Sequence, residues 1–188
     1  MNRFYVSHEA IREGRVIVRG SLVHQIRDVL RLKPGDAIIL LDNSGYAYRA
    51  DLTTIDQDTV RGRIAEKWKL ETEPQARITL YQGLLKGQKF EWVLQKGTEL
   101  GISAFIPLVC ARTIVGSLED VSRARVERWQ RVIVEAAEQS GRALLPHISD
   151  AMLFKQGCDR AARGGFALIP HEGEKARGLR EGLARVPK

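Results

Sequence analysis

The segment LLKGQKFEWVLQKGTELG (residues 84–101) combines residue types that can do chemistry. Lys96 and Glu99 lie one helical turn apart, so the cation and the carboxylate can pair, either as a solvated ion pair or as part of a site. The glycines and the lysine-rich start could indicate a phosphate loop, which needs the pattern G-x-x-x-x-G-K-[ST]. Gly83 and Gly87 do not fit that spacing. We therefore reject a nucleoside-triphosphate site.

A second polar cluster lies in SRARVERWQRVIVEAAEQSGR (residues 122–142), whose apolar residues recur at helical spacing. Its first half carries four arginines: Arg123, Arg125, Arg128 and Arg131. A helix dipole disfavours cations there, so these arginines form either a solvated charged face or a surface for phosphates. Its end brings four polar residues close together: Glu135, Glu138, Gln139 and Arg142. This is an unusually polar helix C-terminus.

The N-terminal part has its own basic strip: Arg12, Arg15, Arg19, Arg27, Arg31 and Lys33. Only Glu13 and Asp28 oppose it within the same stretch. Over the whole chain, 30 Lys and Arg against 23 Asp and Glu give a formal net charge of +7. A basic protein favours a polyanionic partner, nucleic acid above all.

Several other classes of protein have little support. The histidines are scattered without the spacing of metal ligands, and neither Cys110 nor Cys158 lies in a nucleophile motif. No apolar run approaches the roughly 18 residues of a membrane helix, and the start MNRFYVSHEA has no signal-peptide pattern. We therefore expect a cytoplasmic protein without a metal site and without a membrane.

The elements that must position these residues fall into two parts, an α+β / α/β two-domain organisation. Residues 1–73 predict a small β-barrel with one helix, because short alternating runs surround the helical pattern SLVHQIRDVLRL (residues 21–32). The helix is expected to bury Leu22, Ile26, Val29 and Leu30. DNSG (residues 42–45) predicts a hairpin turn. The polar segment ETEPQA (residues 71–76) predicts a linker.

Residues 74–188 predict an α/β domain with a parallel sheet, because strand-like and helical patterns alternate. The expected strands are RITLYQGLL (residues 77–85), ISAFIPLV (residues 102–109) and FALIPH (residues 166–171). In the first helix, one apolar face carries Phe90, Val93, Leu94, Gly97 and Leu100. A glycine on that face predicts the close approach of another backbone.

Three blocks, HQIRDVLRLKPGD (residues 24–36), LLKGQKFEWVLQKGTELGISAFIPL (residues 84–108) and RWQRVIVEAAEQSGR (residues 128–142), together resemble the RsmE family. Their order and spacing match from about Arg3 through FALIPHEG. The resemblance implies a PUA-like barrel followed by a SPOUT domain of the trefoil-knot type. It also implies S-adenosylmethionine as cofactor, a homodimer, and methylation of N3 of a uridine in 16S ribosomal RNA of the small ribosomal subunit.

The resemblance carries over to individual positions. Lys86, Glu91, Lys96, Glu99 and Leu100 match K-x-x-x-x-E-x-x-x-x-K-x-x-E-L, Gln139 and Arg142 match Q-x-x-R, and His24, Leu30 and Arg31 match H-x-x-x-x-x-L-R. With the basic strip, the predicted RNA contacts are Arg3, Arg12, His24, Arg27, Arg31, Lys33, Lys86 and Gln139. Glu91, Lys96 and Glu99 would organise the cleft, Ile169, Pro170 and His171 would line the methyl-donor pocket, and Arg142 would stabilise the anion formed when uracil loses its N3 proton.

The family's next segments, a GPEGG-type loop and an LRTETA-type loop that form the knot, do not occur in residues 1–188. We therefore expect the SPOUT domain to be incomplete and these residues alone not to methylate RNA. The alternative is a non-catalytic RNA-binding protein with a degenerate α/β domain. The sequence names neither the general base nor the uridine.

Overall fold

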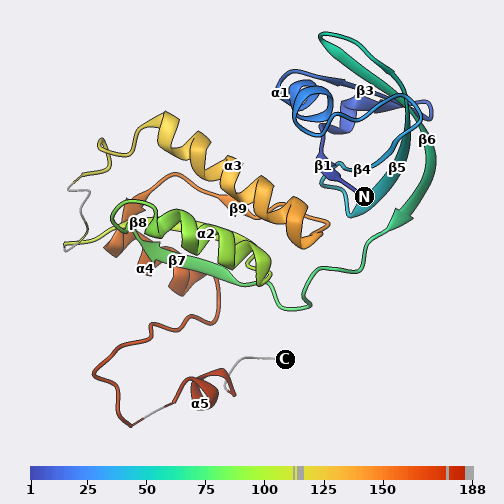
Figure 1. The fold of residues 1–188 in the computed structure, drawn as a ribbon. Helices are drawn as coiled ribbons and strands as arrows, with labels where there is room; N and C mark the ends of the chain where they lie inside the picture. The colour runs from blue at the N-terminus through green and yellow to red at the C-terminus, as the bar shows by residue number, and fades with distance from the viewer. Residues whose placement is uncertain (112, 114–116, 177, 185–188) are drawn as a thin grey trace.

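The computed structural model describes residues 1–111, 113, 117–176 and 178–184. A curled β-sheet is built from residues 3–69, and an α/β unit follows after residues 70–78 (Figure 1). The two parts lie side by side, with β1 of the sheet facing the C-terminal half of α3.

The curled sheet has six strands in the order β1–β4–β5–β6–β3–β2. Their bounds are β1 Arg3–Tyr5, β2 Ile11–Arg12, β3 Arg15–Arg19, β4 Ala37–Leu41, β5 Tyr46–Ile55 and β6 Thr59–Lys69. Only the β1–β4 pair is parallel. A short 3-10 helix, η1 (His8–Ala10), joins β1 to β2. The predicted small barrel with one helix is thus confirmed as a mostly antiparallel curled sheet.

The β4–β5 hairpin turns at DNSG as predicted. Asn43 and Gly45 both have positive φ, +60° and +89°, a conformation that Asn and Gly adopt more readily than other residues. Asp42 fixes the turn, because its carboxylate accepts hydrogen bonds from the backbone N–H and the hydroxyl of Ser44 and from the Tyr48 hydroxyl. The register of the hairpin places alternate residues of β4 in the barrel core, where Ile38 and Leu40 are fully buried.

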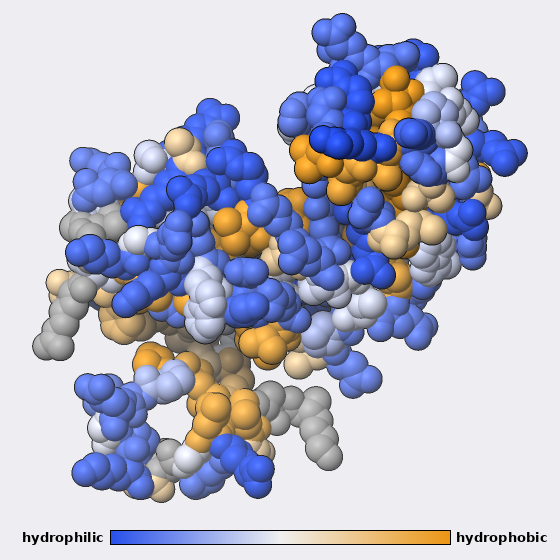
Figure 2. Space-filling model, viewed as in Figure 1, coloured by the Kyte–Doolittle hydropathy of each residue, from blue (hydrophilic) through white to orange (hydrophobic). Residues whose placement is uncertain are grey.

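The barrel helix differs from its predicted apolar stripe. It runs as α1 (Ser21–His24) and continues as a π-helical turn, η2 (Gln25–Val29). Val23 and Ile26 are buried, whereas the side chain of Val29 is 63% exposed and Leu30 is also exposed. The wider π-helical turn changes the 3.6-residue spacing on which the prediction relied. Figure 2 shows apolar surface on the side of the barrel where α1 lies.

The α/β unit has a parallel sheet centred on β8 (Ala104–Val109), with β7 (Thr79–Gly83) on one side. The short strands β9 (His147–Ile148) and β10 (Met152–Leu153) pair with β8 on the other side. The helices are α2 (Lys89–Glu99), α3 (Arg123–Ser140) and α4 (Phe154–Arg163). α2 and α3 lie together on one face of the sheet, and α4 lies on the other (Figure 1).

Helix α2 covers the sheet through a face close to the predicted one. Phe90 and Leu94 are buried, and the Phe90 ring packs against Trp129 of α3 with centroids 4.6 Å apart. Leu100 is the exception, since it lies past the helix end and is 82% exposed. The expected backbone neighbour of Gly97 is instead an aromatic ring: a Cβ at this position would lie 2.7 Å from Cε1 of Phe105.

The predicted strand at residues 166–171 is wrong. The segment forms no strand, and Ile169 is 71% exposed. A strand needs a neighbour to pair its N–H and C=O groups, and no described strand runs beside this segment (Figure 1). A short helix, α5 (Leu179–Leu183), follows it. Among the described residues, no helix is long and apolar enough to span a membrane.

Candidate functional site

A cleft of about 1090 Å³ separates the barrel from α3. The barrel wall comes from β1 and from the α1–η2 helix, and the opposite wall is one side of α3. Of the residues predicted to contact RNA, Arg3 and Gln139 line this cleft. The exposed apolar side chains of Val29 and Leu30 also face into it. The cleft therefore joins polar groups to an apolar surface, an arrangement that can hold an unstacked base.

Hydrogen bonds join β1 to the end of α3 beside the cleft. The Tyr5 backbone N–H donates to Oε1 of Glu138 at 2.8 Å, and the Tyr5 hydroxyl donates to the carbonyl oxygen of Arg142 at 2.6 Å. A third contact joins the hairpin turn to the same region, since the Leu145 N–H donates to Oδ1 of Asn43 at 2.7 Å. These three bonds fix the barrel against the α/β unit.

Arg3 lies against the C-terminal cap of α3. Gly141 ends the helix in the left-handed conformation, with φ +73°, and a Cβ there would lie 3.3 Å from Nη1 of Arg3. The Arg3 guanidinium thus sits beside the negative end of the helix dipole, which favours a cation. Its contact with RNA stays a prediction.

Arg142 is buried, with a side chain that is only 6% exposed. Its Nη2 lies 2.5 Å from Oε2 of Glu73, and its Nη1 donates to the carbonyl oxygens of Thr98 and Ile102. Glu73 also accepts the N–H groups of Ala143 and Leu144 at 2.9 and 3.1 Å. These contacts favour a positioning role, in which Arg142 clamps the linker to α2 and α3. Its predicted role beside a reacting uracil stays a prediction.

The linker is fixed at a second point. Gly101, just after α2, has φ +94°, and a Cβ added there would lie 2.3 Å from Cγ of Pro74. Pro74 thus packs directly on the Gly101 backbone. Together with the Glu73 clamp, this contact means that the segment predicted as a linker is anchored to the α/β unit.

The pKa values of three groups at this junction are shifted. Burial, followed by the charge of Glu73, raises the pKa of the Tyr5 hydroxyl above its usual value. Burial also raises the pKa of Glu138, and the neighbouring carboxylate of Glu135 raises it further. Burial alone would raise the pKa of Glu73, but the hydrogen bonds from Arg142 and the Leu144 N–H outweigh it and lower that pKa.

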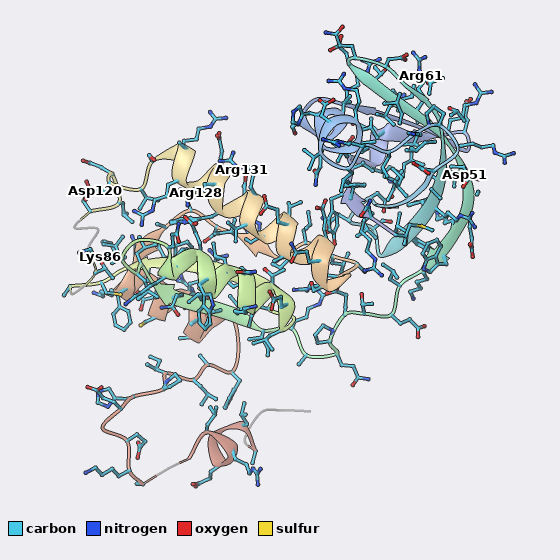
Figure 3. All side chains as sticks on the ribbon, in the orientation of Figure 1. Asp51, Arg61, Lys86, Asp120, Arg128 and Arg131 are labelled. Carbon is cyan, nitrogen blue, oxygen red and sulfur yellow. The ribbon has the colours of Figure 1, made fainter. Side chains whose placement is uncertain are left out.

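A smaller groove of about 320 Å³ runs between α2 and α3. Gln139 lines it as well as the cleft, and Glu91 lines it while its Oε2 pairs with Nη2 of Arg128 at 2.8 Å. Arg128 and Arg131 lie on α3, as Figure 3 shows. Trp92 forms one side of the groove with 62% of its surface exposed. The structure thus brings Glu91 and Gln139 to one surface.

Lys96 and Glu99 pair with each other one turn apart on α2, with Nζ 2.8 Å from Oε2. Both side chains are partly exposed, as expected for a solvated ion pair. Lys86 lies exposed in the loop between β7 and α2 (Figure 3). None of these three residues lines the cleft or the groove.

The basic strip of the barrel also lies outside the cleft. His24 and Arg27 both approach Asp28, and Arg27 also donates to the carbonyl oxygen of Gln57. The remaining predicted residues of the strip, Arg12, Arg31 and Lys33, are exposed. The structure therefore divides the predicted RNA contacts between the cleft and other surfaces of the barrel.

The residues predicted to hold the methyl donor lie apart from the cleft and the groove. Ile169, Pro170 and His171 are all exposed, and none lines the cleft or the groove. Their role in the methyl-donor pocket stays a prediction. No group of three or more potential metal ligands occurs among the described residues.

Tyr5, Glu73 and Glu138 are central to the junction and were not predicted as site residues. For Glu138 the sequence did give an indication, because this residue belongs to the unusually polar helix end EAAEQSGR. Tyr5 lay in a short strand pattern and Glu73 in a polar linker, and neither pattern marks a contact over more than 65 residues of chain.

Two family models match the chain. A model described as RNA methyltransferase domain matches residues 71–186, and one described as RNA methyltransferase PUA domain matches residues 19–65. Among solved structures, ribosomal RNA small subunit methyltransferase E from Neisseria gonorrhoeae bound to S-adenosyl methionine has a TM-score of 0.79 at 29% identity, over 89% of this chain and 68% of that one. A putative methyltransferase from Legionella pneumophila in complex with the same cofactor has a TM-score of 0.79 at 25% identity, over 85% and 66%.

Relatives in sequence carry one name. Ribosomal RNA small subunit methyltransferase E of Bacillus subtilis is 32% identical over 181 residues, which cover 95% of this chain and 71% of the relative. Its counterpart from Synechocystis is 36% identical over 160 residues, 85% of this chain and 51% of the relative. The chain thus spans between about half and three quarters of the length of these relatives. On both the family models and these relatives, the chain belongs to the family of ribosomal RNA small subunit methyltransferase E.

Proposed function

We propose that the protein to which this chain belongs methylates N3 of a uridine in 16S ribosomal RNA, with S-adenosylmethionine as the methyl donor. The observation that carries the proposal is the cleft between a PUA-like barrel and α3 in a chain that matches both RNA methyltransferase models. The barrel supplies an RNA-binding surface, and the polar and apolar walls of the cleft suit a base taken out of its stack.

The reaction needs N3 of uracil to lose its proton, because the protonated nitrogen is a poor nucleophile. A nearby cation stabilises the resulting anion. Close alignment of N3 with the donor's methyl group then allows the methyl transfer. Arg3 and Arg131 are the cations that line the cleft. We propose that Arg142 acts through them and through Glu73, by holding β1, the linker and α3 in place.

S-adenosylmethionine would supply the methyl group. Ile169, Pro170 and His171 remain the proposed residues of its pocket, although they are exposed in this structure. The described residues alone therefore support RNA binding more directly than methyl transfer. We expect residues 1–188 by themselves to bind the donor weakly or not at all, which calorimetry would check.

A cytoplasmic homodimer is part of the proposal. Trp92 and Leu100 expose large apolar surface on and beside α2, 62% and 82%, and a second copy of the chain could cover it. Light scattering on the wild-type chain and on Trp92→Glu tests this point. A dimer that survives the substitution would place the interface elsewhere.

The test of the function uses the full-length gene. Mass spectrometry of small-subunit ribosomal RNA should find a uridine carrying a methyl group on N3 that is lost when the gene is deleted and restored when it is returned. An unchanged methylation pattern in the deletion strain would contradict the proposal. RNA binding by the full-length protein without methyl transfer would support the RNA-binding alternative.

A further inference from the structure

The outer face of the β6–β3–β2 part of the barrel sheet carries five exposed arginines: Arg12, Arg15, Arg19, Arg61 and Arg63. Side chains alternate between the faces of a strand. Val16 and Val18 of β3 therefore point into the core, where they are 1% and 3% exposed, and the arginines beside them point into solvent. The sequence showed part of this set as a basic strip, but only the fold aligns it with β6.

Three of these arginines form one row across the strands, which we call the arginine row. In the register of the sheet, Arg12 lies opposite Arg15, and Arg15 lies opposite Arg63. Neighbouring strands lie about 4.8 Å apart, so the backbones in the row span about 10 Å. Arg61 and Arg19 continue the charge along β6 and β3 on the same face.

Protein carboxylates do little to neutralise the row. Among the described residues, no carboxylate oxygen is recorded within 4.0 Å of a side-chain nitrogen of Arg12, Arg15 or Arg63. Asp51 lies opposite Arg63 in the register, but its recorded ion pair is with Arg49 at 3.6 Å. Like charges directly opposite each other on a sheet repel. A row of three such cations is therefore unfavourable without an anionic partner.

The row differs from an ordinary solvated charged face. On α2 and α3 several exposed charges have an ion-pair partner, as Lys96 does with Glu99 and Arg123 with Glu127. The row also lies apart from the cleft, since none of its members lines it. Figure 3 shows the neighbouring Arg61 and Asp51 on the side of the barrel turned away from α3.

We propose that the arginine row is a second RNA-contact surface, which grips phosphates of an RNA segment outside the one held in the cleft. The planar guanidinium binds phosphate oxygens through two parallel hydrogen bonds, and a row on a rigid sheet presents three such groups in a fixed order. The row reads no bases, so it would add affinity and orient a folded RNA without choosing the uridine. The inference rests on the proposed function in taking RNA as the substrate.

The salt dependence of RNA binding tests the row. Three variants are compared with the wild-type chain of 188 residues: R12Q/R15Q/R63Q, its charge-preserving counterpart R12K/R15K/R63K, and the control K155Q/R160Q/R163Q, which removes three exposed charges from α4. The probe is a fluorescein-labelled RNA hairpin with single-stranded flanks. Fluorescence anisotropy at several potassium chloride concentrations gives the slope of log K against log salt.

We expect the glutamine row variant to lower the magnitude of that slope by about 2 to 3, because each lost phosphate contact removes about 0.7 to 0.9. The lysine row variant and the α4 control should keep the wild-type slope. Circular dichroism checks that each variant is folded. If the triple glutamine variant unfolds, the single variants R12Q, R15Q and R63Q replace it, and each should lower the magnitude of the slope by about 0.7 to 0.9; folded single variants with the wild-type slope would overturn the inference.

Two results would overturn the inference alone: a folded glutamine row variant with the wild-type slope, or an equal loss of slope in the α4 control, which would mean that only total charge matters. Binding to phosphatidylglycerol vesicles but not to the hairpin would assign the row to a membrane and also overturn it. A wild-type chain that fails to bind the hairpin at every salt concentration tested would contradict the proposed function as well. Failure of the inference alone can therefore be distinguished from failure of the proposed function.

Discussion

Replacing Glu73 with alanine would remove the acceptor that holds the linker to the end of α3. Glu73 accepts hydrogen bonds from Nε and Nη2 of Arg142 and from the N–H groups of Ala143 and Leu144. Because the Arg142 side chain is only 6% exposed, water cannot fully replace the lost carboxylate. Removing one partner of a buried ion pair destabilises a protein by about 3 to 5 kcal/mol.

The lower end of that range applies here. The Glu73 side chain is 24% exposed, so water can reach the two backbone N–H groups that lose their acceptor. We therefore expect Glu73→Ala to lower the free energy of unfolding by about 3 kcal/mol. For a chain of this size, that change corresponds to a fall in Tm of about 6 to 12 °C.

Urea unfolding followed by tryptophan fluorescence measures the effect, because Trp129 is buried in the core of the α/β unit. Glu73→Gln should have a smaller effect, since the amide oxygen still accepts an N–H. The matched control is Glu127→Ala, which breaks an exposed pair with Arg123 and should change stability by about 0.5 kcal/mol or less. If Glu73→Ala matched this control, the clamp would not stabilise the junction and the reasoning would fail.

Three further predictions concern single residues. Gly97→Ala should lower the free energy of unfolding by about 1 to 2 kcal/mol, because overlap with the Phe105 ring outweighs the gain in helix propensity, and thermal unfolding would detect it. Lys96→Ala removes only a partly exposed pair with Glu99, and urea unfolding should show a change of about 0.5 kcal/mol or less. Glu138 has a raised pKa, so the folded state binds its proton more tightly than the unfolded state, and its contribution to stability falls as pH rises from about 4.5 through the folded pKa. Glu138→Gln keeps an acceptor for the Tyr5 N–H without titrating, so its stability measured from pH 4 to pH 8 should fall less with rising pH than that of the wild type; an unchanged profile would contradict the shift.

Local patterns predicted the elements that depend on local chemistry. The DNSG turn is specified by residues that tolerate positive φ, and the apolar spacing of α2 placed Phe90 and Leu94 in the core. Periodicity was less reliable at the barrel helix, where a π-helical turn carries Val29 out of the predicted stripe. The residues at 166–171 have the composition of a strand, but a strand also needs a neighbour, which composition does not specify.

The junction was the least predictable part of the site. Arg142 was singled out by its motif. The motif does not reveal that its guanidinium would pair with the carboxylate of Glu73, 69 residues away. Gln139 and Arg3 were predicted by resemblance as RNA contacts; both line the cleft, and their contact with RNA stays a prediction. The arginine row needed the strand register, because Arg63 joins Arg12 and Arg15 only through pairing of distant strands.

The anchored linker has a consequence for how the two parts could be exchanged between relatives. Glu73 follows directly on the barrel in the chain, but all its recorded bonds are to the end of α3 and the turn after it, and Pro74 packs on the residue after α2. The segment that follows the barrel in the chain therefore contributes to the stability of the α/β unit. In a chimaera joined before Glu73, Glu73 and Pro74 stay with the α/β unit that they stabilise. In one joined after Pro74, the foreign barrel has to supply a glutamate and a proline at these two positions. An exchanged barrel should therefore end before Glu73, because Glu73 and Pro74 belong structurally with the α/β unit.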